Sequence, residues 1–315
     1  MNGTASSRSP DGNDGSLDTS SRILEALEVI HNPRSLNNTR QKASQYLEEV
    51  KSDEEAPYHG FTLASVKSQP AIIRHYGLSL IEHAIRHRWP DYTPEQSTAL
   101  RNWVLSLAQG VNDEDLVYIR NKIAAIWVEI AKRSWVLDWM DMDELLVQLW
   151  GGTVAQKLLV LTVLESLSED IFGHEDLTAG LRGTDLYRAC VEIFTPASVL
   201  TEYFPTRETS VNVRYGEEGW LSRIGDLVEW CSSERSGEEF RQVCAIKALS
   251  TLKSIMGWII PRALVTTHCV HRVCGCLAAS NLPIQLVSTS SRPLTKKTKH
   301  LFTGLGCRGW AVYTL

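Results

Sequence analysis

From Ile23 onward, the apolar residues of this chain recur at the spacing of an α-helix. In the segment 22–30 (RILEALEVI) Ile23, Leu24, Leu27 and Ile30 share one face, and Pro33 follows. The segments 39–50 (TRQKASQYLEEV) and 60–68 (GFTLASVKS) continue this spacing. Apolar residues three or four positions apart indicate amphipathic helices, whereas strict alternation would indicate strands. The pattern predicts helices and gives no convincing sign of strands or of βαβ alternation.

The segment 71–89 (AIIRHYGLSLIEHAIRHRW) lies between two prolines, Pro70 and Pro90. We expect its arginines and histidines to lie opposite an apolar stripe. That stripe consists of Ile72, Ile73, Tyr76, Leu80, Ala84 and Ile85.

The same pattern continues downstream. In the segment 93–110, Thr93 is a suitable N-cap, Pro94 fits the first helical position, and Gly110 fits the end of the helix. Further helices are predicted at 113–133, 142–150, 153–172, 184–195, 219–232, 238–258 and 262–280.

Helix pairs that recur roughly every 40 residues are typical of HEAT and armadillo arrays. We therefore predict an all-α fold, a HEAT-repeat (armadillo-like) right-handed solenoid of antiparallel helix pairs over residues 21–287. A globular helical bundle is the alternative. Short successive helices without a long central helix favour the solenoid.

The two ends of the chain differ from this pattern. Residues 1–20 are rich in Ser, Gly, Asp and Asn and have no apolar core, which predicts a disordered tail and not a signal peptide. Residues 288–315 mix Ser, Thr, Lys and Gly without a helical period, so we expect an atypical, disordered or aberrant tail. Our hypothesis for this end is a shifted reading frame, a retained intron or a fragmentary gene model. Comparison with the genomic sequence downstream tests it.

Composition and charge narrow the function classes. The 315 residues contain 32 Lys and Arg against 37 Asp and Glu, a net charge of −5, which gives no whole-protein reason to expect nucleic-acid binding. No apolar run is long enough to span a bilayer. The seven cysteines lie mostly within apolar helical patterns and suit a reducing compartment, the cytoplasm or the nucleus.

Two histidine-containing clusters resemble metal sites, but neither matches one. His83 and His87 are one helical turn apart, but Ala84 stands where a zinc-protease helix carries its glutamate. The segment 268–276 (HCVHRVCGC) lacks the usual ligand spacing for zinc. Its apolar residues fit one helix face instead, formed by Val265, Cys269, Val273, Cys276 and Leu277. We expect no metal and no cofactor.

The remaining candidate motifs also favour a packing role or carry little weight. Seven tryptophans lie within or beside apolar helix faces and are expected to bridge successive repeats, because a large ring fills the wedge between helix pairs. These are Trp103, Trp127, Trp135, Trp139, Trp150, Trp230 and Trp258. No phosphate loop, nucleophile elbow or paired catalytic carboxylates are evident. The basic run 296–300 (KKTKH) lies in the atypical tail and is discounted as a nuclear-localisation signal.

Two phrases carry a family resemblance. The segment 74–83 resembles R-H-[FY]-G-L-x-x-[IL]-E-H, and the segment 129–139 resembles E-[IM]-x-K-R-x-W-x-x-x-W. Together they resemble the N-terminal region of importin-β-type nuclear transport receptors, most of all exportin-5 and its fungal counterparts. The resemblance covers roughly residues 20–287. Family members commonly carry proline after each paired tryptophan, where this chain has Val136 and Met140. Relatives also continue several times further.

The resemblance implies a non-enzymatic receptor that shuttles between nucleus and cytoplasm. It would bind GTP-loaded Ran on its first repeats and protein or RNA cargo on later ones, and would contact FG-repeat proteins of the nuclear pore without membrane insertion. An importin-type receptor and a generic helical-repeat scaffold without Ran dependence remain alternatives.

For Ran we expect a polar row at equivalent places of three successive repeats. Charge reversal in this row, at Arg74 and Lys122, should weaken Ran binding well over tenfold. The row comprises Arg40, Gln41, Arg74, His75, Arg120, Asn121 and Lys122.

Overall fold

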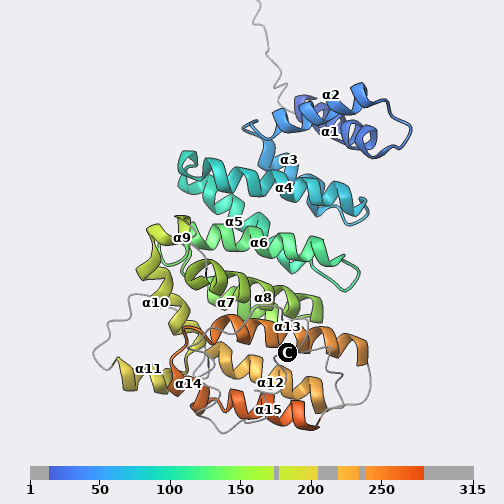
Figure 1. The fold of residues 1–315 in the computed structure, drawn as a ribbon. Helices are drawn as coiled ribbons and strands as arrows, with labels where there is room; N and C mark the ends of the chain where they lie inside the picture. Colours follow the sequence, from blue (N-terminus) through green and yellow to red (C-terminus); the bar gives the residue numbers. More distant parts are fainter. Residues whose placement is uncertain (1–13, 174–176, 205–218, 234–237, 280–315) are drawn as a thin grey trace, which may run out of the picture. The chain divides into compact units, whose positions relative to one another are not determined.

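The structure, a computed structural model, describes residues 14–173, 177–204, 219–233 and 238–279. All regular structure in these ranges is helical, and one isolated bridge joins Trp135 and Trp139. The all-α prediction is therefore confirmed, and the helices follow one another as the pairs of a HEAT-repeat solenoid (Figure 1). The chain divides into two compact units, the first ending at Gly110 and the second beginning at Val111.

Over residues 14–110, the part that the structure describes, the first unit contains five α-helices. They are α1 (Asp14–His31), α2 (Asn37–Val50), α3 (Ala56–Ser65), α4 (Ala71–Arg88) and α5 (Pro94–Gln109), with a 3₁₀ turn at Trp89–Asp91. Helix α1 packs on α2, and α3 packs on both α4 and α5. Thr93 caps α5 in a capping box with Gln96, Pro94 opens the helix and Gly110 ends it, as the sequence predicts.

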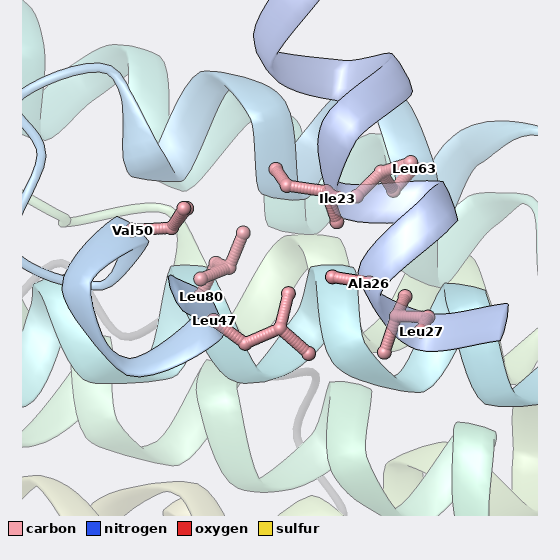
Figure 2. Packing of buried hydrophobic residues seen from close by; sticks show 7 residues of the cluster. All are labelled: Ile23, Ala26, Leu27, Leu47, Val50, Leu63 and Leu80. Atoms are coloured by element: carbon pink, nitrogen blue, oxygen red, sulfur yellow. The ribbon is translucent and has the colours of Figure 1, made fainter. Parts of the chain in front are cut away.

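One apolar cluster joins the first four helices of this unit (Figure 2). It is formed by Ile23, Ala26, Leu27, Leu47, Val50, Leu63 and Leu80. Tyr76 of α4 adds a polar link, because its hydroxyl donates a 2.8 Å hydrogen bond to the carbonyl oxygen of Leu47. The pairs α1–α2 and α3–α4 therefore share a core, as stacked repeats do.

Helices α3 and α4 approach each other backbone to backbone. A Cβ atom at Gly77 would lie 2.5 Å from the carbonyl oxygen of Gly60, and one at Gly60 would lie 2.6 Å from that of Gly77. Real Cβ atoms do not come this close to a backbone oxygen. The glycine in the phrase 74–83 therefore has a packing role.

The second unit contains ten α-helices in the described ranges. They are α6 (Val117–Ser134), α7 (Met142–Trp150), α8 (Val154–Ser168), α9 (Leu177–Leu181), α10 (Gly183–Phe194), α11 (Ala197–Tyr203), α12 (Gly219–Ser233), α13 (Glu238–Ile255), α14 (Pro261–Thr266) and α15 (Cys269–Ala279). A π-helical turn at Glu169–Gly173 extends α8. Helix α8 lies between α6 and α13, and α12 lies between α13 and α15 (Figure 1).

Buried ion pairs link α6 to the turn after α8. Lys132 is fully buried, and its Nζ lies 3.0 Å from Glu129 Oε1 and 2.8 Å from Asp170 Oδ2. Arg133 binds the other oxygen of Glu129 at 2.6 Å. Because both cations share one carboxylate and a second carboxylate completes the set, these buried charges are paired, as a low-dielectric interior requires.

Polar side chains also join α8 to α13. Glu165 of α8 accepts hydrogen bonds from Lys247 and Ser250 of α13. Thr251 donates to the carbonyl oxygen of Leu161 at 3.2 Å. The stacking of α6, α8 and α13 therefore combines apolar burial with specific polar contacts.

Tryptophans fill the turn between α6 and α7. Trp135 and Trp139 are both buried, and the rings of Trp127 and Trp139 lie 5.1 Å apart between centroids. The predicted burial of this pair is confirmed. Trp230, by contrast, is exposed and contacts Arg241 through its ring.

Some predicted boundaries change. Helix α1 begins at Asp14, so the expected end of the N-terminal tail at residue 20 falls inside a helix; residues 1–13 lie outside the described ranges. The helix predicted at 262–280 is two helices, α14 and α15. The boundary at 287, the tail 288–315 and the basic run at 296–300 lie outside the described residues.

Candidate partner-binding surface

A basic residue occupies the fourth position of each of the helices α2, α4, α6, α8 and α13. The residues are Arg40, Arg74, Arg120, Lys157 and Arg241. The prediction that Arg40, Arg74 and Arg120 hold equivalent places therefore agrees with the helix bounds.

In the first unit these arginines are used within the fold. Arg74 is only 6% exposed, and its Nε donates a 3.2 Å hydrogen bond to the carbonyl oxygen of Ala64, in the last turn of α3. Arg40 donates from Nη2 to the carbonyl oxygen of Asn32 at 2.7 Å. Since carbonyls at a helix end lack partners within the helix, these arginines stabilise the preceding turn.

The second unit repeats this arrangement. Lys157 donates from Nζ to the carbonyl oxygen of Gly152 at 2.9 Å, and burial lowers its pKa. Burial also lowers the pKa of Arg120, and the opposite effect of the nearby Cys244, Asp113 and Asp115 is smaller. Asp113 in turn accepts a 3.2 Å hydrogen bond from the backbone N–H of Ala155, which ties the loop before α6 to the start of α8.

The residues that directly follow the three arginines are exposed or half-buried. Gln41 and Asn121 are exposed, and His75 and Lys122 are half-buried. The seven predicted residues therefore divide into two groups. Arg40 and Arg74 hold neighbouring turns in place, and Arg120 lies half-buried near Asp113 and Asp115. The other four side chains are exposed or half-buried.

Exposed apolar residues also lie at the start of α6. Leu116, Val117 and Tyr118 are 52%, 59% and 44% exposed. Ile72, beside Arg74 on α4, is exposed as well. The apolar stripe predicted for the segment 71–89 included Ile72, and that part of the prediction is wrong. The signal that the pattern missed is position, because Ile72 lies in the first turn of α4.

The histidine pair on α4 forms a ring contact. The rings of His83 and His87 lie 4.5 Å apart between centroids. Burial lowers the pKa of His83, with smaller contributions from His87 and Lys51, so the neutral form is favoured. In the described part of the chain, no group of three or more His, Cys, Asp or Glu side chains is placed to hold a metal ion.

The cysteine-rich segment packs into the second unit. Cys269, Val273 and Cys276 are buried on α15, as the face prediction requires. Val265, which was assigned to the same face, is exposed and belongs to α14, so that part of the prediction is wrong. The described helices include none that is both long and apolar enough to cross a membrane.

Comparisons with known proteins identify the family. Residues 117–188, from α6 into α10, match the family model described as Exportin 1-like protein. The chain is 33% identical over 278 residues to Protein MSN5 of Saccharomyces cerevisiae, which covers 84% of this chain and 22% of the yeast protein. It is 27% identical over 270 residues to Exportin-5 of Mus musculus, which covers 84% of this chain and 21% of the mouse protein.

A plant relative shows the same likeness over a shorter stretch. Protein HASTY 1 of Arabidopsis thaliana is 28% identical over 176 residues, or 55% of this chain. The chain thus spans about a fifth of the length of the yeast and mouse relatives. With its paired helices and its two sequence phrases, it is an exportin-5-like member of the importin-β family.

Proposed function

We propose that this chain is part of a nuclear export receptor whose first repeats bind GTP-loaded Ran. The observation that carries the proposal is the similarity to exportin-5 and MSN5 over 84% of the chain. The receptor shuttles between nucleus and cytoplasm, carries protein or RNA cargo and contacts FG-repeat proteins of the pore. It acts by binding and catalyses no reaction, since Ran itself hydrolyses the GTP.

The outward-facing residues at the helix starts suit such a partner. Gln41, His75, Asn121 and Lys122 offer hydrogen-bond donors to acidic side chains, and charge-assisted bonds contribute about 1.5–3 kcal/mol each. Arg40 and Arg74 hold the turns that precede their helices.

The burial of Arg74 changes the design of the test. Arg74→Glu would place a carboxylate against the carbonyl oxygen of Ala64, so a loss of Ran binding could come from damage to the fold. The informative reversal is Lys122→Glu, alone and together with Gln41→Glu, since both positions retain solvent access.

Binding of the purified chain to Ran loaded with GTP or GDP tests the proposal. We expect GTP-dependent binding that Lys122→Glu weakens over tenfold, since one lost charge-assisted bond exceeds the roughly 1.4 kcal/mol of a tenfold change. Arg188→Glu is the matched control, because it reverses an exposed cation on α10 in the same unit. Equal binding to both nucleotide states would instead favour a scaffold without Ran dependence.

The import alternative needs a second measurement. In an importin-type receptor, GTP-loaded Ran expels cargo, whereas in an export receptor Ran and cargo bind with positive coupling. Because coupling between two ligands is reciprocal, cargo would raise Ran affinity only in the export case.

A further inference from the structure

A buried carboxyl group joins two helices that are distant in the chain. Asp143, the second residue of α7, is 1% exposed, and its Oδ1 accepts a 2.8 Å hydrogen bond from Nε1 of Trp220. Trp220 is the second residue of α12 and is fully buried. Its ring meets that of Trp150, at the other end of α7, edge-on with centroids 5.5 Å apart. The indole therefore contacts both ends of α7.

The loss of water around the second oxygen of this carboxyl group is not offset by a hydrogen bond from any residue that the structure describes. Asp143 Oδ2 is buried and has no hydrogen-bond partner among the described residues. An ionised carboxylate can accept about four hydrogen bonds, and burying the charge with few of them filled costs free energy. A neutral carboxyl group at the same place carries much less of that cost.

The charges around Asp143 do not remove this imbalance. Arg223 of α12 favours the carboxylate, and Glu144 of α7 opposes it. Helix α8 also packs against α7 and carries Lys157. The Nζ of Lys157 donates to the carbonyl oxygen of Gly152, beyond the far end of α7. Burial outweighs the hydrogen bond from Trp220 and raises the pKa of Asp143 from 3.8 to about 7.

We propose that Asp143 is a proton-controlled joint between α7 and α12, which its neutral carboxyl group holds together and its carboxylate loosens. Opening the joint exposes the group to water, where its pKa returns to the ordinary value. Because the closed-state pKa is raised, the stabilising contribution is complete below the open-state value, 3.8, and is lost as the pH rises through about 7. The joint is therefore tighter in mildly acidic than in mildly alkaline solution.

Hydrogen exchange of the whole 315-residue chain, read peptide by peptide, tests the joint. Exchange rates of α7 and α12 are divided by the intrinsic rates at each pH to give protection factors. We expect protection to fall about tenfold per pH unit from about pH 5 to about pH 7 and then to level off, since one proton is released on opening. Peptides of α2 and α4, in the other unit, provide the internal reference.

Two variants assign the effect to Asp143. Asp143→Asn cannot ionise, so protection of α7 and α12 should no longer depend on pH in this range. Asp141→Asn makes the same chemical change at an exposed position two residues away and should keep the wild-type slope. A wild-type protein without the slope, or an Asp143→Asn variant that retains it, overturns the proposal.

A third variant covers the case in which Asp143→Asn does not fold. Trp220→Phe removes the hydrogen bond that lowers the closed-state pKa of Asp143, so protection should continue to fall to a higher pH before it levels off. If Trp220→Phe leaves the pH dependence where the wild type has it, Asp143 does not control the joint.

Discussion

In the first unit α3 and α4 meet backbone to backbone, whereas in the second unit α6, α8 and α13 are held by large and charged side chains. The first contact depends on what is absent, a side chain at Gly60 and at Gly77. The second depends on what is present, the ring of Trp135 and the ion pairs of Lys132 with Asp170 and of Lys247 with Glu165. The same repeat architecture is thus stabilised in two ways.

This difference predicts opposite sensitivities to substitution. A contact made by glycines tolerates no added atoms, because close-packed backbones cannot move apart without losing the apolar contacts around them. A contact made by large side chains is weakened by removal of atoms, which leaves a cavity. The contact between α3 and α4 should therefore be sensitive to added atoms, and the turn at Trp135 to their removal.

The largest effect is expected for Trp135→Ala in the second unit. Trp135 is fully buried after α6, and its carbonyl oxygen accepts a hydrogen bond from Arg182, so its ring and its backbone both fix this turn. Loss of the ring should lower the free energy of unfolding by about 3–5 kcal/mol. Urea denaturation measures the loss, and hydrogen exchange should locate it in α6 and its neighbours.

Trp230→Ala is the control for this substitution, because Trp230 lies in the same unit but is exposed. We expect a clearly smaller loss there. Equal losses at Trp135 and Trp230 would show that burial of the ring does not explain the stabilisation.

A smaller effect is expected for Gly77→Ala in the first unit. The added methyl group would lie 2.5 Å from the carbonyl oxygen of Gly60 and 3.0 Å from the backbone nitrogen of Ala64, so α3 and α4 must separate. Overpacking of this kind costs about 1–3 kcal/mol. The loss should be confined to the first unit, measured again by denaturation and local hydrogen exchange.

Gly110→Ala tests whether the effect belongs to the helix contact. A Cβ atom there meets nothing closer than 3.4 Å and the backbone has an ordinary helical φ of −74°, so we expect little change. A destabilisation at Gly110 as large as that at Gly77 would assign the effect to glycine replacement in general.

The sequence predicts the helices and their pairing well, because helical spacing and capping residues are local signals. It predicts the rotation of each helix less well. On α4, Ile72 is exposed and Arg74 is buried, the reverse of the expectation for both. Apolar periodicity alone does not show that the backbone of α3 lies close to that of α4 at Gly77.

The candidate site shows the same limit. Equivalent positions of Arg40, Arg74 and Arg120 follow from counting along the helices, but the contacts of Arg40 and Arg74 within the fold depend on carbonyl groups of the preceding turns. The turn after Trp135 is a further case. Val136 has a φ of 72°, which proline cannot adopt, so the backbone here requires a residue other than proline.

The smallest predicted effect is shared by both units and comes from their capping boxes. Thr93 accepts from the backbone N–H of Gln96 at 3.3 Å at the start of α5, and Thr153 accepts from that of Gln156 at 3.2 Å at the start of α8. In both boxes the glutamine side chain returns a hydrogen bond to the threonine N–H. Thr93→Ala and Thr153→Ala should each cost about 1 kcal/mol, because each leaves one N–H of the first turn without its partner. The serine variants keep the hydroxyl and should recover most of the loss.

Since a cap acts within its own helix, the two units should respond alike here, although they respond in opposite ways at their helix contacts. A several-fold larger loss at Thr153 than at Thr93 in denaturation experiments would show that the packing of α8 between α6 and α13 makes its first turn depend on more than its cap.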